Sequence, residues 1–271
     1  MEVVKVVKFL VCTVVPFVGV LYALLLVYVY YNQTSMIFHT EKLPANYKFD
    51  YPQKFEEINT KSFDNVNLNG LLFRAENPKG LVFYLHGNAG TLGTWGSISK
   101  IYTDLGYDIF IMDYRGFGKS DGEIVDETQI NKDVALVYSK LCKRYAEKDI
   151  YIAGYSIGSG LATILASNNQ PKALLLQSPY YSFTELSSKI APYFPNFIKR
   201  FKLESYSYFT KIKAPIYIFH GEDDELIPVD NGLKLSKLKS AGIHYFGLKN
   251  QGHGDMNENE VFQKELQTIL N

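Results

Sequence analysis

The first hydrophobic run of the chain is long enough to cross a membrane. Residues 9–31, FLVCTVVPFVGVLYALLLVYVYY, contain 23 residues without a charge, which is about 34 Å of helix. Lys5 and Lys8 precede the run and tyrosines crowd its far end, as in the aromatic belt of a membrane interface. A cleaved signal peptide has a shorter apolar run that ends in small residues. The pattern therefore predicts a single membrane anchor over residues 1–31.

The charges on the two sides of the anchor bear on its orientation. Lys5 and Lys8 on one flank are matched by Lys42 and Lys48 on the other. The numbers of Lys and Arg residues on the two sides of the span, which set the orientation of a membrane helix, are therefore nearly equal. We expect the N-terminus inside the cytoplasm and the bulk of the chain outside it.

Residues 32–54 show little periodicity and carry two prolines, which predicts a connector between the membrane and a domain over residues 55–271. The runs 55–63 and 66–74 predict two strands joined by the two-residue connection Asp64-Asn65, a β-hairpin. Further apolar runs predict buried strands at 80–86, 107–113, 149–154, 172–178, 215–220 and 243–248.

Helical patterns separate most of these strands, at residues 97–105, 126–145, 158–167, 229–240 and 258–270. In the second of them, Ile130, Val134, Val137 and Leu141 recur every three or four positions along one face. Strands that are apolar throughout and alternate with helices are typical of a parallel sheet covered on both faces. The opening hairpin makes the sheet mixed. The sequence thus predicts an α/β domain with an eight-stranded, mostly parallel sheet.

Composition and charge exclude several classes of protein. The 271 residues are 46% hydrophobic, with 28 basic and 28 acidic side chains, so the chain can bury a substantial core and is not disordered. The absence of a basic surplus argues against a nucleic-acid partner. Two cysteines 130 positions apart, Cys12 and Cys142, exclude a disulfide framework and a zinc site.

The strand predicted over 149–154 leads into Gly154-Tyr155-Ser156-Ile157-Gly158, a G-x-S-x-G motif followed by a helical pattern. In this motif a sharp turn between strand and helix holds the serine in a strained backbone conformation, and flanking glycines avoid Cβ clashes. The motif alone is common by chance, but its place between a strand and a helix is specific. Ser156 is therefore the candidate nucleophile.

A serine nucleophile needs a histidine base. Of the five histidines, His253 lies in a polar loop after the last predicted strand, where a base at the end of the sheet is expected. His86 and His220 each end a strand before a glycine, and we interpret them as structural. His244 lies inside a strand between apolar neighbours and is interpreted as a packed core residue, while His39 falls in the connector.

An acid must orient the base, and four acidic residues in a row, Glu222 to Glu225, follow the strand predicted over 215–220. Spacing alone leaves the choice among them open. The alternative is a solvated acidic turn that caps the helix beginning near Pro228.

Two backbone N–H groups are needed to stabilise the oxyanion. Ile157, directly after the serine, supplies one. The loop His86-Gly87-Asn88-Ala89-Gly90 supplies the other, with Asn88 as the expected donor. A phosphate-binding loop is the alternative for these glycines, but no G-K-[ST] follows.

Together these residues resemble the α/β-hydrolases of the membrane-anchored ABHD-type group, which is grouped with the serine-aminopeptidase-like hydrolases. The resemblance spans residues 55–270 and rests on LHGNAG (85–90), DYRGFGKSDG (113–122), GYSIGSG (154–160), HGEDDELIP (220–228) and QGHGD (251–255). In that family H-G-x-x-D-x-x-[IV]-P carries the acid, which implies Asp224 and a triad of Ser156, Asp224 and His253. Asp113 and Arg115 match positions that shape the adjacent loop.

A small cap over about residues 179–214 bears on the substrate. Peptidase relatives of this family have a larger cap with acidic residues that bind a peptide amino terminus, whereas Glu185 and Glu204 are the only acids here. Ten aromatic rings occupy the interval instead: Tyr180, Tyr181, Phe183, Tyr193, Phe194, Phe197, Phe201, Tyr206, Tyr208 and Phe209. The rings favour an acyl substrate, although each could equally pack the cap onto the domain.

The sequence therefore predicts a membrane-anchored serine hydrolase that cleaves carboxylic esters or thioesters through an acyl-enzyme, without cofactor or metal. Its expected partner is a small-molecule or lipid-like acyl substrate. Peptidase or amidase activity is the alternative within the same fold. A non-catalytic binding protein is the alternative from a different class, because the fold alone does not prove activity.

Overall fold

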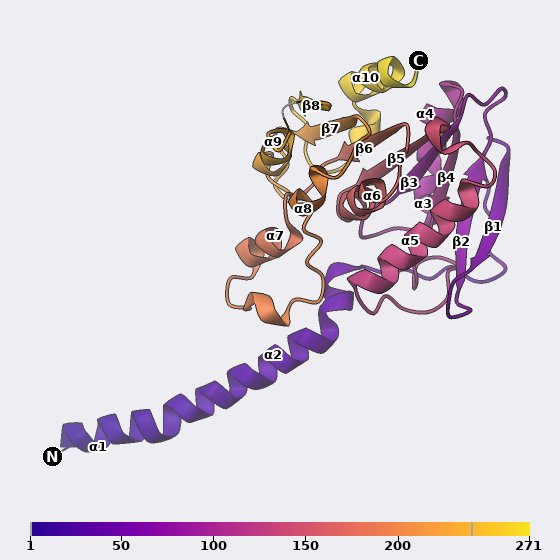
Figure 1. The fold of residues 1–271 in the computed structure, drawn as a ribbon. Coiled ribbons are helices and arrows are strands. Elements are labelled where there is room, and N and C mark those ends of the chain that lie inside the picture. Colours follow the sequence, from indigo (N-terminus) through magenta and orange to yellow (C-terminus); the bar gives the residue numbers. More distant parts are fainter. Residues whose placement is uncertain (1, 240) are drawn as a thin grey trace.

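A computed structural model describes residues 2–239 and 241–271 as one long N-terminal helix joined to a domain built on an eight-stranded sheet (Figure 1). The strands are β1 (Phe55–Lys61), β2 (Asn67–Phe73), β3 (Leu81–Leu85), β4 (Asp108–Met112), β5 (Ile150–Tyr155), β6 (Ala173–Gln177), β7 (Ile216–Gly221) and β8 (Ile243–Leu248). Their order is β1-β2-β4-β3-β5-β6-β7-β8. β2 pairs antiparallel with β1 and β4, and the other pairs are parallel. The predicted fold is confirmed.

The first two strands form the predicted hairpin, but its turn is one residue longer than expected. The backbone N–H of Ser62 donates to the carbonyl of Val66 at 2.8 Å and extends the ladder beyond β1 and β2. Three residues, Phe63 to Asn65, therefore close the turn, and Asn65 adopts a left-handed φ of 64°. Asparagine tolerates this conformation better than most residues, and a left-handed last residue is typical of three-residue hairpins.

Helices cover both faces of the sheet, which explains why the central strands β3 to β6 are buried at every position. Along β3, Leu81, Phe83 and Leu85 face one core and Val82 and Tyr84 face the other. The helices are α3 (Leu92–Trp95), α4 (Ser99–Asp104), α5 (Glu127–Leu141), α6 (Ile157–Ser167), α7 (Phe183–Ile190), α8 (Tyr206–Phe209), α9 (Asp230–Ser236) and α10 (Glu260–Leu270). Single turns of 3-10 helix lie at Gly96–Ile98, Glu147–Asp149, Asn196–Ile198 and Met256–Glu258.

Two predicted helices and one predicted core residue differ from the structure. The helix expected over 126–145 is α5, which ends at Leu141. The helix expected over 229–240 is α9, which ends at Ser236, and Ser240 lies outside the described residues. The interpretation of His244 as a core residue is wrong: its side chain is exposed and stacks on Tyr217, with ring centroids 4.8 Å apart. Its strand, β8, is at the edge of the sheet and is less completely covered than the central strands.

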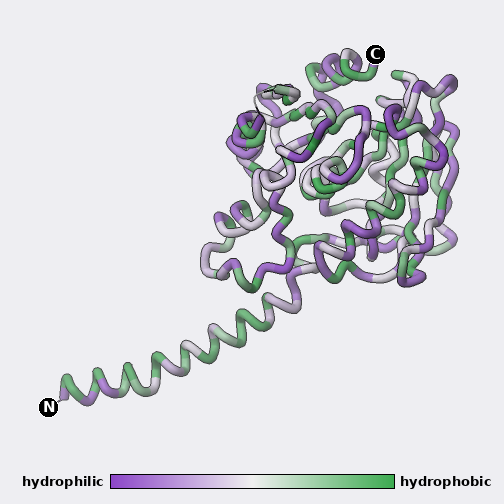
Figure 2. Tube along the Cα trace, in the orientation of Figure 1, coloured by the Kyte–Doolittle hydropathy of each residue, from purple (hydrophilic) through white to green (hydrophobic). Residues whose placement is uncertain are grey.

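The N-terminal helix runs from α1 (Glu2–Phe9) through a π-helical turn (Leu10–Val14) into α2 (Val15–Ile37). The π-turn ends two residues before Pro16, whose missing N–H and bulky ring disturb a regular helix. The 36 residues of this helix are long and apolar enough to cross a membrane, and the window of highest hydropathy is fully unburied (Figure 2). The helix continues six residues past position 31, into the segment expected as connector.

The residues that follow α2 pack onto the domain and do not form a free linker. Phe38 is buried, and its ring contacts those of Phe117 and Phe201 edge-on at 6.4 and 5.4 Å. The backbone N–H of Leu43 donates to the Gly118 carbonyl at 3.0 Å. The C-terminal end of the anchor is therefore fixed to the domain, beside the cap between β6 and β7 (Figure 1).

Candidate active site

Ser156 lies between the end of β5 and the start of α6, as the motif predicts. Its backbone adopts φ 53° and ψ −119°, a conformation that side chains other than glycine rarely adopt. The serine N–H donates to the Gln177 carbonyl on β6 at 3.0 Å, and the serine carbonyl accepts from Ser159 at 2.9 Å. These bonds, on both sides of the residue, hold the strained turn in place.

The glycines of the motif are required by close contacts. A Cβ atom on Gly158 would overlap the carbonyl groups of Leu85 and His86, and one on Gly154 would lie 2.6 Å from the Cβ of Ala162. Helix α6 thus packs directly against the ends of β3 and β5, and the prediction that Cβ atoms would clash here is confirmed.

The structure brings Ser156, His253 and Asp224 into one hydrogen-bonded row. His253 Nε2 lies 3.0 Å from Ser156 Oγ, and His253 Nδ1 lies 2.8 Å from Asp224 Oδ2. An ionised carboxylate only accepts hydrogen bonds, so Nδ1 carries the proton and Nε2 accepts from the serine hydroxyl. This tautomer is the one that a general base requires.

Asp224 is buried, yet its surroundings favour the charged form. Burial acts to raise the pKa of its carboxyl, but hydrogen bonds from the His253 ring and the Ile227 N–H outweigh that effect and lower the pKa below its usual 3.8. Oδ1 accepts from the N–H groups of Leu226 at 3.1 Å and Ile227 at 2.8 Å, which leaves Oδ2 free to orient the histidine.

The two histidines interpreted as structural are fully buried beside the site. His220 Nε2 lies 2.7 Å from the Ile227 carbonyl, which braces the loop that carries Asp224. His86 Nδ1 lies 2.7 Å from the Gly87 carbonyl, at the start of the loop with Asn88. Burial lowers the pKa of His86 to about 4, so its ring is neutral at physiological pH.

The two expected oxyanion donors border the same cavity as Ser156. Ile157 is the first residue of α6, so its N–H has no acceptor within the helix. The carbonyl and the side chain of Asn88 hold the residue in place. The carbonyl accepts from the His39 N–H at 2.8 Å, and the side-chain amide donates to the Ile37 carbonyl at 3.0 Å. In the part of the chain that the structure describes, no protein acceptor takes the Asn88 N–H.

A cavity of about 340 Å³ extends from Ser156, and its lining is mostly apolar. Its walls come from α2, the cap, and the loops after β3, β5 and β7. No Asp or Glu occurs among the described residues that line it. Four of the ten rings of the cap line it: Tyr180, Phe183, Phe194 and Phe201. Glu185, one of the two cap acids, instead pairs with Lys234 and Lys189 at 2.8 and 3.3 Å.

The family described as serine aminopeptidase, S33, matches residues 76–207. The lysophosphatidylserine lipase ABHD12 of Danio rerio is 32% identical over 200 residues, 66% of this chain and 52% of that protein. Protein bem46 of Schizosaccharomyces pombe is 31% identical over 199 residues, 69% of this chain and 66% of its own length. The chain belongs to the ABHD-type serine hydrolases of the α/β-hydrolase superfamily.

This ABHD-type chain spans about half the length of the vertebrate relatives that it matches. Solved structures share its fold. An esterase of Pyrococcus furiosus superposes with a TM-score of 0.69 at 17% sequence identity, and the match covers 86% of this chain and 97% of the esterase.

The loop motif DYRGFGKSDG of this hydrolase is structural, as expected. Arg115 is buried and its guanidinium bonds to the carboxylates of Asp64 and Asp133, which ties the β1–β2 turn to α5. Asp113 is buried and accepts the N–H of Leu92 at 3.0 Å, at the start of α3. The loop beside the active site is thereby held from two sides.

Sequence reasoning missed two residues that position the base. The hydroxyl of Tyr155, the residue before Ser156, donates to the carbonyl of His253 itself. The Gln251 carbonyl accepts from the Asp223 N–H at 3.0 Å and joins the loop of the base to the loop of the acid. Tyr155 directly precedes Ser156, and Gln251 lies two residues before His253. Their bonds nevertheless join positions that are 98 and 28 residues apart in the sequence, respectively.

Sequence reasoning also missed the part that the anchor takes in the cavity. Val29, Gln33, Met36 and Ile37 of α2 line it together with His39. The only signal was the polar stretch Asn32-Gln33-Thr34-Ser35 after the apolar run, which does not by itself reveal where the helix packs.

Proposed function

We propose that this chain hydrolyses the carboxylic ester of a single-chain acyl lipid. The observation that carries the proposal is the row Ser156–His253–Asp224, with contacts of 3.0 and 2.8 Å, at the end of an apolar cavity. A ligand site of about 340 Å³ is at the small end of the usual range, which suits one acyl chain. The name of the Danio rerio relative, lysophosphatidylserine lipase, supports the same substrate class.

The proposed reaction follows the acyl-enzyme route. Ser156 Oγ attacks the ester carbonyl while its proton passes to His253 Nε2, and Asp224 stabilises the resulting imidazolium. The N–H groups of Asn88 and Ile157 donate to the oxyanion of the tetrahedral intermediate. Collapse of the intermediate breaks the bond to the alcohol, which takes the proton from His253. Water then repeats the sequence on the acyl-enzyme and releases the fatty acid.

The cavity supports an ester substrate over a peptide. An aminopeptidase needs a carboxylate to pair with the substrate's amino group, and none occurs among the described lining residues. A thioester differs from an ester only in its leaving group, so it remains within the proposed activity. A non-catalytic role requires a triad too far apart for hydrogen bonds, and the observed contacts count against it.

We place the domain at the membrane on a single span, with the N-terminus in the cytoplasm and the catalytic domain on the other side. Lys5 and Lys8 lie within four residues of the apolar run, closer to it than Lys42 and Lys48 on the other flank, which favours this orientation. Protease treatment of intact cells tests it directly. The domain should be degraded under conditions that leave a cytoplasmic marker intact, and a fully protected domain would reverse the proposed orientation.

The mechanism is tested by labelling the detergent-solubilised full chain with a fluorophosphonate, which reacts with an activated serine. Wild type and His244→Ala should label, because His244 is exposed on the edge strand. Ser156→Ala and His253→Ala should not. Labelling that persists in Ser156→Ala would show that another residue is the nucleophile, and a folded wild type that does not label would overturn the proposed activity.

A further inference from the structure

One segment of the cap is built like a membrane-contacting surface. Residues 190–198, IAPYFPNFI, contain no charge, and Lys189, Lys199 and Arg200 flank them directly. The side chains of Ile190, Tyr193 and Phe197 are 68%, 80% and 82% exposed. Large apolar side chains gathered in one exposed segment mark an interaction surface, and flanking basic residues are typical of segments that lie in a lipid interface.

This cap segment is fastened to the anchor helix along its length. The hydroxyl of Tyr22 donates to the Tyr193 carbonyl at 2.6 Å. Farther along the helix, the amide of Gln33 donates to the Ile198 carbonyl at 2.7 Å and accepts from the Arg200 N–H at 2.9 Å. Gln33 is buried, so its amide is shielded from water while it donates one bond to the cap backbone and accepts another from it.

The contact at Tyr22 places the cap segment at membrane depth. A hydrocarbon core of about 30 Å takes about 20 residues of helix, so a span that starts at Phe9 ends near Tyr28. Tyr22 lies six residues before Tyr28, or roughly 9 Å inside that boundary for an upright helix. Interfacial elements commonly reach about 5–10 Å below the headgroups, so the bound Tyr193 lies within this layer.

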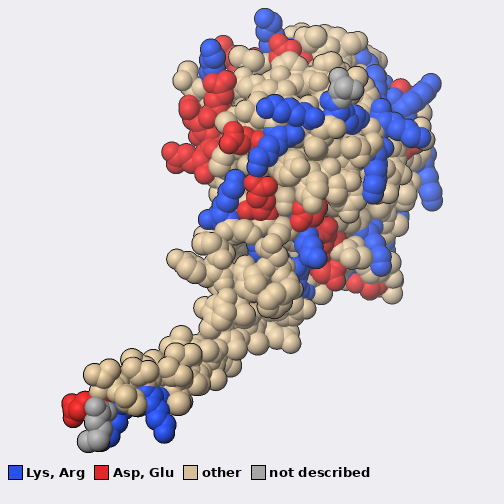
Figure 3. Space-filling view, turned by 60° about the vertical axis from the view of Figure 1, so that its left-hand side comes forward, with Lys and Arg blue, Asp and Glu red and all other residues tan. Residues whose placement is uncertain are grey.

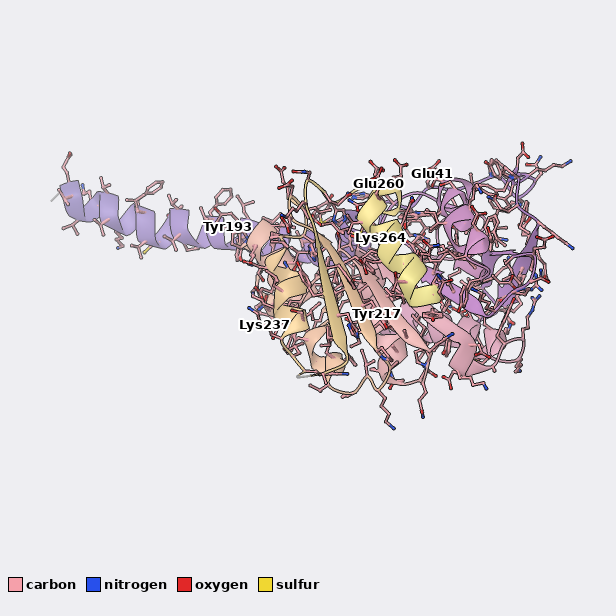
Figure 4. The ribbon with its side chains drawn as sticks, turned by 90° about the horizontal axis from the view of Figure 1, so that it is seen from above. Glu41, Tyr193, Tyr217, Lys237, Glu260 and Lys264 are labelled. Carbon is pink, nitrogen blue, oxygen red and sulfur yellow. The ribbon has the colours of Figure 1, made fainter. Side chains whose placement is uncertain are left out.

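The figures show the continuity of the two elements. Figure 4 places Tyr193 where the anchor helix meets the body of the domain. Figure 3 shows uncharged surface that continues from the helix onto the adjoining part of the body, with charged side chains at the free tip of the helix and over the rest of the body.

The cavity that begins at Ser156 ends between these same two elements. Val29 and Gln33 of α2 line one side of it, and Ile190 and Phe194 of the cap line the other. Ile190 both lines the cavity and is exposed, so the cavity borders the surface of the cap segment.

We propose that the cap segment 190–198 enters the same leaflet as the adjoining end of the anchor, and that the lipid substrate passes from this leaflet to Ser156 between α2 and the cap. The inference rests on the proposed function, because it names the route by which a single-chain acyl lipid reaches the site. The anchor thereby serves as a wall of the substrate site as well as a tether. Along this route the acyl chain of the lipid stays in apolar surroundings, which avoids the free-energy cost of exposing the chain to water.

The route is tested with the full-length protein in phosphatidylcholine vesicles. The double variant Tyr193→Asp/Phe197→Asp adds charge to the segment at two exposed positions that do not line the cavity. Hydrolysis of palmitoyl lysophosphatidylserine in the vesicles should fall by roughly tenfold or more, because charge opposes insertion. Hydrolysis of water-soluble p-nitrophenyl butyrate should stay near the wild-type rate.

The matched control is Val261→Asp, which replaces an exposed apolar residue of α10, at the other end of the domain from the anchor (Figure 1). It should leave both rates unchanged. Equal loss of both substrates in the cap variant, or unchanged lipid hydrolysis, would overturn the proposed route. Loss of butyrate hydrolysis in Ser156→Ala tests the proposed function separately, so failure of the two proposals can be told apart.

Insertion itself is measured by fluorescence. Tryptophan at position 197, in Phe197→Trp, should be quenched by phospholipids brominated near the headgroup, relative to the parent chain with Trp95 alone. Tryptophan in Val261→Trp should not be quenched. If the fluorescence of Phe197→Trp is quenched no more than that of Val261→Trp, the segment stays in water and the proposed insertion is refuted.

Discussion

The side-chain amide of Asn88 donates a 3.0 Å hydrogen bond to the carbonyl of Ile37, the last residue of the anchor helix. This bond satisfies one of the helix's terminal carbonyls, which have no partner inside the helix. It also fixes the loop whose backbone N–H is the proposed oxyanion donor. The N-terminal helix and the loop of the proposed oxyanion donor are thus joined by one hydrogen bond, so the position of the helix bears on the position of the donor.

Replacing Asn88 by alanine should lower kcat and leave KM nearly unchanged. The backbone N–H remains, but without its side-chain bond the loop is less well aimed at the oxyanion, an interaction that forms in the transition state. We expect a fall of roughly tenfold with p-nitrophenyl butyrate. Asn168→Ala is the matched control, because that amide bonds to the Ile164 carbonyl of α6 at 2.8 Å. A raised KM with normal kcat would show that Asn88 acts on binding instead.

Asp224→Asn should nearly abolish turnover while the protein stays folded. An amide at this position donates to His253 Nδ1 and stabilises the tautomer that cannot accept the serine proton. A loss of about a thousandfold or more in kcat is expected by analogy with other triads. The neighbouring Asp223→Asn should retain activity, because the Asp223 side chain is exposed and the row of contacts involves Asp224. The reverse result would assign the acid to Asp223.

The central strands were predictable because both faces of the sheet are covered there, so each is a continuous apolar run with turn residues at its ends. Ser156 and His253 were singled out from the sequence because Ser156 directly follows a strand and His253 lies in the loop after the last one, where the topology gathers side chains. Asp224 was indicated only by the family resemblance, because four acids share its turn and spacing alone does not choose among them; in space its burial and its contact with His253 distinguish it.

The packing of the anchor could not be predicted. Apolar residues occupy every side of this helix, so they carry no periodicity that marks a protein-facing stripe. Gln33 contacts residues 165 or more positions away, and such a pairing leaves no local pattern. His244 was misassigned for a related reason, because an apolar strand sequence does not reveal that the strand is at the edge.

Gln33→Ala should loosen the cap from the anchor. It leaves the Ile198 carbonyl and the Arg200 N–H without partners in a buried place, which costs about 1–3 kcal/mol. Local opening should therefore rise by roughly tenfold. Trypsin, which cleaves after Lys199 and Arg200, reports this opening as faster cutting of the folded protein.

The control for loosening is Asn32→Ala, whose side-chain amide donates to the Tyr28 carbonyl within the same helix at 2.8 Å. Its cleavage rate after Lys199 and Arg200 should match the wild type. Equal rates in Gln33→Ala and Asn32→Ala would mean that the two bonds of Gln33 do not hold the cap.

Asp113 gives a pH-dependent prediction. Its carboxyl is buried, and burial raises its pKa from 3.8 to about 7 despite the Leu92 N–H that it accepts. A carboxyl with a raised pKa in the folded state contributes stability below the unfolded pKa, and this contribution is lost as pH rises through the folded value. For Asp113 the loss therefore runs from about pH 4 to about pH 7.

Asp113→Asn removes that titration, because an amide stays neutral and keeps an oxygen that can accept the Leu92 N–H. Relative to wild type, the variant should gain roughly 2–3 kcal/mol of unfolding free energy between about pH 5 and about pH 8. The comparison is made by urea unfolding of the detergent-solubilised proteins at the two pH values, with the exposed Asp121→Asn as control. A variant-minus-wild-type difference that is the same at both values would show that Asp113 is ionised in the folded protein at the lower pH, and that its bond from Leu92 outweighs the cost of its burial.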